Sequence, residues 1–255
     1  MARLLDLLIP AGTAILSIRL FGAGLHRRYR IFFIYLIFET LHLSVLELLG
    51  VKSDLYEKVW AVTEPVEWVF YFLLVVEIYS LVLEDYRGLS TVGRWVLIGA
   101  FLLALLASAL SLLAPSAYNQ QTRTMTYFIV ADRAVYFSLL IFLISILFFL
   151  LRYPITLSRN IIIHSIVFSV YFIGNTVIYL VLSLAGYHSG PAVGYAVSAI
   201  TLGTVVAWLM LMNPAGEKRK QSARPRWMPG REEALVSQLN YLNAALLKAT
   251  HNRPK

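Results

Sequence analysis

The sequence contains no cysteine, and only 14% of its 255 residues are charged. The absence of cysteine excludes disulfide bonds, thiolate metal sites, iron–sulfur clusters and covalently attached haem. In soluble globular proteins about a quarter of the residues are charged, so this chain is unusually poor in charge. Because 59% of its residues are hydrophobic and its mean hydropathy is +0.70, the composition predicts an integral membrane protein.

The sequence motifs of common membrane enzymes are missing as well. The chain has no histidine-rich connector, no serine-plus-histidine arrangement, no glycine-rich phosphate loop and no paired-aspartate motif. The sequence therefore favours a protein that is not an enzyme, and a metal-dependent membrane enzyme is kept as an alternative.

Apolar segments that are long enough to cross a bilayer recur along the chain. A hydrocarbon core of ~30 Å requires about 20 apolar residues in helical conformation. Seven segments meet this requirement: residues 4–25, 31–49, 59–83, 92–113, 127–151, 160–184 and 191–212. The sequence thus predicts an all-α seven-helix transmembrane domain over residues 1–212, a basic juxtamembrane linker over 213–229 and an amphipathic tail helix over 230–255.

The distribution of arginine and lysine predicts the orientation of this bundle, because short cytoplasmic connectors are enriched in these residues. Alternate connectors and the tail are rich in them, with Arg27, Arg28, Arg30, Arg87, Arg94, Arg152 and Arg159 before the tail. The opposite connectors hold only Arg3, Lys52, Lys58 and Arg123. We therefore expect a multi-pass protein of the bacterial inner membrane, with its N-terminus outside and its C-terminus in the cytoplasm.

The formal net charge of +8 is concentrated behind the last predicted span. This position predicts contact with anionic lipid headgroups at the cytoplasmic face, not with nucleic acid, through Lys218, Arg219, Lys220, Arg224 and Arg226. The tail helix that follows has leucines at positions 235, 239, 242 and 246, which form an apolar stripe. Such a helix either lies on the membrane or the bundle, or joins a homodimer or a separate protein partner.

Ionisable residues inside the predicted spans are the most informative feature of the sequence. Glu64 and Glu67 lie three residues apart within WAVTEPVEWVFY, residues 60–71. A charged side chain near the bilayer centre costs at least ~2.5 kcal/mol, so such groups are expected to face partners inside the bundle. At 1.5 Å of rise per residue, six ionisable residues lie between ~7 and ~15 Å below the outer surface: Glu39, His42, Glu64, Glu67, Asp132 and Arg133. Three others fall in the inner half and form a possible second cluster: Arg19, Glu77 and His164.

The six outer residues have two competing interpretations. In the first, Arg133 and the carboxylates pair with one another and only hold the helices together. In the second, they line an outward-facing cavity that binds a small polar ligand, an ion or protons, because ionisable residues inside a membrane mark functional sites by default.

Metal binding is a further alternative, although no cofactor is predicted from the sequence as the main interpretation. Glu39 and His42 form a Glu-x-x-His pair, which carboxylate-bridged di-metal bundles use on two of their helices. No second Glu-x-x-His occurs, so a single zinc, iron or manganese ion would need Glu39, His42, Glu64 or Glu67 as ligands. A haem between two histidines is disfavoured, because His42 and His164 lie in different halves of the bilayer.

The predicted organisation of residues 1–212 is similar to that of bacterial seven-span sensor modules. Retinal-binding proteins are excluded, because no lysine occurs within any predicted span to form the Schiff base. The similarity implies that the chain senses a small ligand or ion and signals through a separate partner. The alternative is a proton- or ion-coupled transporter or channel, which requires a polar path from Glu67 past Glu77 to the cytoplasm.

Overall fold

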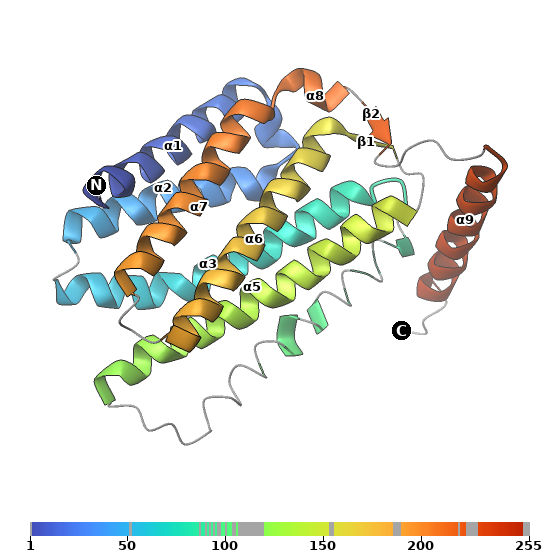
Figure 1. The fold of residues 1–255 in the computed structure, drawn as a ribbon. Coiled ribbons are helices and arrows are strands. Elements are labelled where there is room, and N and C mark those ends of the chain that lie inside the picture. The colour runs from blue at the N-terminus through green and yellow to red at the C-terminus, as the bar shows by residue number, and fades with distance from the viewer. Residues whose placement is uncertain are drawn as a thin grey trace.

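The computed structural model describes residues 2–50, 53–86, 120–152, 156–185, 190–218, 220–222 and 229–251, with scattered positions between 88 and 106. The described chain is helical apart from one pair of three-residue strands, so the prediction of an all-α fold is confirmed (Figure 1). The elements are, in chain order, α1 (Ala2–Gly22), the 3₁₀ helix η1 (Leu25–Arg27), α2 (Arg30–Leu49), α3 (Asp54–Val82), α5 (Gln120–Arg152), β1 (Thr156–Ser158), α6 (Arg159–Ala185), α7 (Gly190–Leu211), α8 (Pro214–Lys218), β2 (Lys220–Ser222) and α9 (Pro229–His251).

Six long helices pack side by side in a closed circuit (Figure 1). α1 packs against α2 and α7, α3 joins α2 to α5, and α6 joins α5 to α7. α6 also contacts α3 across the circuit, and it is the most deeply buried of the long apolar helices. Residues on α6 therefore reach the interior of the bundle along most of its length.

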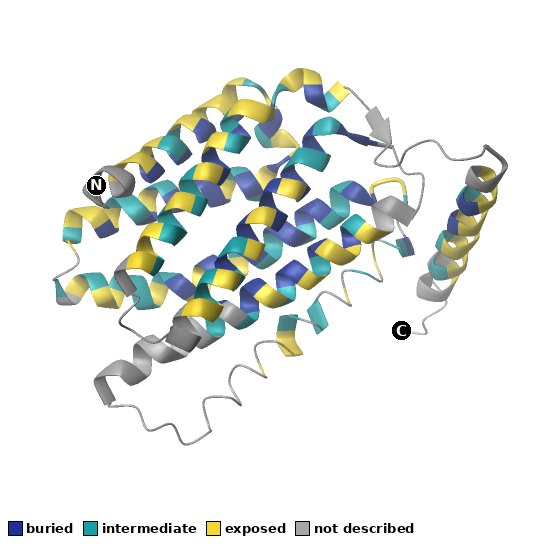
Figure 2. Ribbon diagram, in the orientation of Figure 1, coloured by how far each residue is buried: buried dark blue, intermediate teal, exposed yellow. Residues whose placement is uncertain are grey.

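Four of the described helices are long and apolar enough to cross a membrane. They comprise Arg30–Leu49, Leu55–Val82, Arg159–Val181 and Ala192–Leu211, and shorter apolar helices cover Leu7–Gly22 and Ala134–Phe148. Each long helix buries one face and exposes the other (Figure 2), and the exposed faces carry large apolar side chains such as Ile18, Leu48 and Met210. Extended apolar surface of this kind is typical of contact with lipid or with another protein. The predicted span over 92–113 lies mostly outside the described residues.

Two helices begin well before the apolar segments that predicted them. α3 starts at Asp54, where the Ser53 hydroxyl accepts a hydrogen bond from the Leu55 N–H and caps the helix. α5 starts at Gln120 and therefore extends seven residues beyond the predicted limit at residue 127. In both cases the additional residues are mostly polar, so hydropathy alone did not include them. α3 continues without a break through Pro65, which is exposed on the outer face.

One end of the bundle collects four connecting segments, and we call it the α8 end. It comprises η1, the turn after α3, the β1–β2 pair and α8 (Figure 1). β1 and β2 pair antiparallel, with Leu157 opposite Gln221, so the segment that follows α8 returns to the start of α6. The predicted basic linker over 213–229 is thus partly folded onto the bundle through α8 and β2.

Candidate functional site

The structure brings five of the six predicted outer residues into the interior between α2, α3 and α5. α2 supplies Glu39 and His42, α3 supplies Glu64 and Glu67, and α5 supplies Asp132. Each of the five is at most 8% exposed. We call these five residues the polar layer. Arg133 belongs to α5, but its side chain lies outside the described positions.

Three residues of the polar layer form a compact group that we call the trio: Glu39, His42 and Glu67. One ligand atom from each of the three lies within 4.8 Å of the others. His42 Nδ1 is 2.8 Å from Glu67 Oε1, yet the two atoms are not aligned as a hydrogen bond. The Glu-x-x-His spacing places Glu39 and His42 on one face of α2, and α3 packs against α2 with Glu67 opposite. The trio has the donor set of a candidate metal site.

Thr63 determines which ring nitrogen of His42 carries the proton. Its hydroxyl has one hydrogen, which is donated to the Val59 carbonyl at 2.8 Å or the Trp60 carbonyl at 3.1 Å. Toward His42 Nε2, at 2.9 Å, the hydroxyl must therefore accept. In the neutral ring Nε2 then carries the hydrogen, and Nδ1 has a lone pair beside the Glu67 carboxylate.

The second oxygen of Glu67 is held by tyrosines. Tyr71 donates a hydrogen bond to Glu67 Oε2 at 3.2 Å, and its hydroxyl lies 2.9 Å from that of Tyr171 on α6. Since Tyr71 uses its hydrogen on Glu67, Tyr171 is the donor between the two tyrosines. Thr63, Glu67 and Tyr71 follow one another at spacings of four, so a single stripe of α3 builds one side of the trio.

Glu39 differs from Glu67 because one of its oxygens has no partner. Glu39 Oε2 is buried, and no described group forms a hydrogen bond to it. Beside Glu39 lies a small cavity of about 10 Å³, whose lining is mostly apolar and also includes Thr13, Tyr171 and Thr204. A cavity of this size holds about one water molecule.

Glu64 and Asp132 form a separate pair within the polar layer. The two carboxyl groups are in hydrogen-bonding contact across the interface of α3 and α5. A hydrogen bond between two carboxyl groups requires a proton on one of them. The Trp68 indole N–H donates to Asp132 Oδ1 at 2.6 Å, so Asp132 has its own neutral donor. The polar layer is thus divided into the trio and a proton-sharing pair.

The interior between Glu67 and Glu77 is packed with apolar and aromatic side chains. Leu74, Val75 and Ile78 on α3 have no measurable exposure, and Phe32 and Phe172 from the facing helices are equally buried. Between Glu67 and Glu77, the only polar side-chain groups that the described part of α3 carries are the Trp68 indole N–H and the Tyr71 hydroxyl.

The three residues of the predicted inner cluster have three different sets of partners. Arg19 donates to the Met212 carbonyl at 3.1 Å. Glu77 accepts the free backbone N–H groups of Ile31 and Phe32 at the start of α2, at 2.8 and 3.0 Å. His164 is fully buried among aromatic rings, and neither of its ring nitrogens has a described hydrogen-bond partner.

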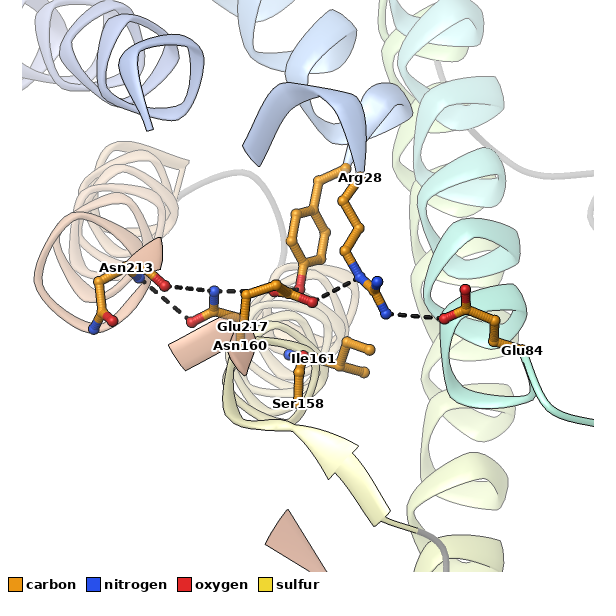
Figure 3. Close-up of polar contacts among 8 residues, drawn as sticks. Arg28, Glu84, Ser158, Asn160, Ile161, Asn213 and Glu217 are labelled. Carbon is orange, nitrogen blue, oxygen red and sulfur yellow. Dashed lines mark hydrogen bonds and ion pairs between the residues drawn. The ribbon is translucent and has the colours of Figure 1, made fainter. Parts of the chain in front are cut away.

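A polar network at the α8 end was not predicted from the sequence (Figure 3). Arg28 binds Glu217 at 2.6 Å and Glu84 at 2.9 Å, and Tyr29 donates to Glu217 at 2.9 Å. Asn160 donates to the Glu217 carboxylate at 3.1 Å. Burial and the neighbouring Glu217 carboxylate raise the pKa of Tyr29 well above its usual range, so the phenol stays protonated as a donor. We call these residues the Glu217 network.

The Asn213-Pro214 pair in the sequence indicated a short helix at this end, which a hydropathy profile does not detect. Asn213 before Pro214 is typical of a helix start, and Asn213 Oδ1 indeed accepts the Gly216 N–H at 2.7 Å. Asn160 Nδ2 donates to the Asn213 carbonyl at 2.8 Å, and a side chain at Gly216 would collide with Asn160. α8 therefore lies directly on the start of α6.

Most of the basic residues predicted to contact lipid lie outside the described positions. Lys218 is described and exposed, Lys220 belongs to β2, and Arg219, Arg224 and Arg226 are not described. In α9, Leu235 and Leu239 are buried, whereas Leu242 is exposed. The Asn243 side chain accepts the Gly88 N–H at 2.7 Å, which places α9 against the segment after α3.

Comparison with known proteins gave no match to a family model, to a curated protein or to a solved structure. The function must therefore be argued from the geometry of the polar layer and the α8 end.

Proposed function

We propose that this chain is a multi-pass membrane protein that binds a small ligand or ion in its polar layer and signals through a separate partner at the α8 end. The observation that carries the proposal is the trio, in which two buried carboxylates and an imidazole lone pair converge. A buried group of this kind is stable only when its charge is balanced or removed by protonation, and a bound cation can supply the balance.

The proposal includes seven spans, with the N-terminus outside and the tail in the cytoplasm of a bacterium. The four long apolar helices and the two shorter ones support membrane insertion. The α8 end joins the connectors around Arg28, Glu84, Asn160 and Glu217, which are the arginine-rich side of the predicted topology. The polar layer then faces the outer half of the bilayer, and Lys218 and the basic residues after it face anionic headgroups.

The packing below the polar layer favours binding over conduction. A transport path would need polar groups or water between Glu67 and Glu77. Leu74, Val75 and Ile78 fill this stretch with side chains that have no measurable exposure. On α3 this packing supports a site that is closed toward the α8 end, as a sensor requires.

α6 supplies the connection from the polar layer to the α8 end. Tyr171 on α6 bonds to Tyr71, and Asn160 at the start of α6 bonds to Glu217. Tyr171 follows Asn160 by eleven residues, which corresponds to about 16 Å along the helix axis. If ligand binding shifts α6 at the polar layer, the helix would move as a rigid body and displace α8. A partner protein bound at the α8 end would detect this displacement.

The absence of cysteine makes the topology directly testable. We expect a Ser53→Cys variant to react with a membrane-impermeant maleimide in intact cells, because Ser53 lies between α2 and α3 on the predicted outer side. A Ser237→Cys variant on α9 is expected to react only after permeabilisation. The unsubstituted chain gives no background signal. The reversed labelling pattern would contradict the orientation.

Signalling is tested with a fluorophore on Ala215→Cys, an exposed position on α8. The labelled protein in liposomes is titrated separately with Na⁺, K⁺, Mg²⁺, Ca²⁺, Zn²⁺ and acetate. We expect a saturable change with at least one probe, which Glu67→Gln removes and Glu47→Gln, an exposed site on α2, retains. Unchanged fluorescence with all six probes would contradict the proposal. Entry into the liposomes of the ion that changes the fluorescence would contradict it as well, because a sensor does not conduct its ligand.

A further inference from the structure

The charge of the trio is unbalanced within the described residues. Glu39 and Glu67 are 6% and 8% exposed, and no described lysine or arginine forms an ion pair with either carboxylate. Glu39 Oε2 has no hydrogen-bond partner, although the residue is more than nine-tenths buried. Two negative charges in the interior require an equal positive charge or protonation.

The contact between His42 and Glu67 points to an ion between them and the third member of the trio. With the hydrogen on Nε2, the Nδ1 lone pair lies 2.8 Å from a carboxylate oxygen of Glu67 but is not directed straight at it. Two lone pairs at this separation repel unless a cation lies near both. A proton on Nδ1 would not point at the Glu67 oxygen, because the pair lacks hydrogen-bond alignment. Two ligands of one transition metal, each about 2.1 Å from it, stand roughly 3 Å apart.

The groups around the trio already orient its ligands. A metal-binding histidine usually donates its other ring N–H to a neighbouring acceptor, and ligating carboxylates are themselves hydrogen-bonded. Thr63 is the acceptor for the Nε2–H of His42, and Tyr71 donates a hydrogen bond to the Glu67 carboxylate.

From these observations we infer that Glu39, His42 and Glu67 bind one divalent transition-metal ion of the Zn²⁺, Mn²⁺ or Fe²⁺ class. The inference rests on the proposed function, because it names the ligand of the polar layer. One imidazole with two carboxylates suits these ions, whereas Cu⁺ prefers sulfur ligands and Ca²⁺ takes six to eight oxygens. A divalent ion balances the two carboxylates, and the unpartnered oxygen of Glu39 becomes a ligand. The cavity beside Glu39 has room for about one water to complete the coordination.

The direct test is metal binding to the full-length protein in detergent or lipid. The protein is stripped with a chelator and equilibrated with Zn²⁺, Mn²⁺ or Co²⁺, and bound metal is counted by elemental analysis after dialysis. We expect one ion per chain, and a visible absorption band for bound Co²⁺. Glu67→Gln and His42→Ala are expected to weaken binding by more than about 100-fold. The matched control is Glu47→Gln, which removes an exposed carboxylate on α2 outside the polar layer, and it is expected to retain full binding.

Thr63→Val tests the positioning of His42 without removing a ligand. We expect a 10- to 100-fold loss of affinity, as for other groups that orient metal-binding histidines, together with a shifted Co²⁺ band. Thr40→Val removes a hydroxyl of the same kind on α2, outside the trio, and is expected to change neither quantity. A purely structural role of Thr63 would lower stability and leave the Co²⁺ band in place.

Two results would overturn the inference: folded protein that binds no metal, and equal loss of binding in Glu47→Gln and Glu67→Gln. Folding of each variant is checked by its elution profile and helical circular dichroism. The fluorophore on Ala215→Cys separates this inference from the proposed function. If the protein binds metal but the fluorescence of the label does not change, signalling is contradicted and the metal site is not. If the protein binds no metal but the fluorescence changes with one of the other probes, the metal site is contradicted and signalling is not.

Discussion

The polar layer and the Glu217 network both hold carboxylates between packed helices, but only the network places an arginine beside its carboxylates. In the Glu217 network, Arg28 stands between Glu84 and Glu217, whose side chains are 61% and 18% exposed. In the polar layer, Glu39 and Glu67 are buried side by side with an imidazole lone pair. Each carboxylate of the first arrangement has a cation beside it, whereas no described lysine or arginine pairs with either carboxylate of the second. An opposite charge beside each carboxylate, and not polarity alone, therefore distinguishes the Glu217 network from the site that we propose to bind a ligand.

The largest expected effect lies in the Glu217 network. Glu217→Ala removes the acceptor of Tyr29 and Asn160 and the partner of Arg28, so buried donors lose their hydrogen bonds. We expect the free energy of unfolding to fall by about 3 kcal/mol. Denaturant titration in mixed micelles measures it, with the exposed Glu47→Ala as the control. A loss no larger than that of the control would show that the network does not hold the α8 end.

The next effect concerns the proton-sharing pair. Trp68→Phe keeps the aromatic ring in place but removes the N–H that Asp132 accepts at 2.6 Å. Hydrogen bonds to charged groups are stronger than neutral ones, so we expect a loss of about 2 kcal/mol in the same titration. Trp95→Phe, at an exposed position, is the matched substitution. Equal stability of the two variants would indicate that Asp132 does not depend on the indole.

A change of opposite sign is expected at the trio. In metal-free protein Glu67→Gln removes one of two neighbouring buried charges, so we expect stability to rise by about 1 kcal/mol. Addition of Zn²⁺ is expected to stabilise the unsubstituted protein and to leave the variant unchanged, because a ligand stabilises only the state that binds it. Thermal unfolding of chelator-treated samples, with and without Zn²⁺, measures both. Destabilisation of the metal-free variant would place the trio with the Glu217 network as a structural contact.

The smallest effect is expected at the exposed edge of the Glu217 network. Glu84→Gln breaks one ion pair of Arg28, but the Glu84 side chain is 61% exposed. Exposed pairs contribute little, so we expect a change below about 0.5 kcal/mol that disappears at high salt. Titrations at low and high ionic strength test it. A loss close to that of Glu217→Ala would mean that the two pairs act as one unit.

Hydropathy located the helices well but not their ends. A window of apolar residues marks the part of a helix that avoids water, whereas backbone hydrogen bonds continue into polar turns. α3 therefore begins at Asp54 with its Ser53 cap, and α5 begins at Gln120. The β1–β2 pair was not predicted, because three-residue strands have no periodicity to detect.

The polar layer was predicted as one group, and the structure divides it. Helical spacing and depth along the helix axis indicated that Glu39, His42 and Glu67 share a level with Glu64 and Asp132. The rotation of α3 decides which partner each carboxylate meets, and that rotation depends on packing across the whole bundle. Thr63 was missed because its role depends on the direction of one hydroxyl hydrogen, although its position four residues before Glu67 was visible in the sequence.

The position of Glu217 also bears on how the protein is made. Tyr29 and Arg28 are synthesised early, and their acceptor lies 188 residues later in the chain than Tyr29, beyond α7. Ribosomes add residues in order, so the Glu217 network cannot close until the six helices of the circuit have been synthesised. Closure of the α8 end is therefore a late event of biogenesis, and a truncation directly before residue 217 would leave these six helices present but would remove the Glu217 contacts that hold this end together.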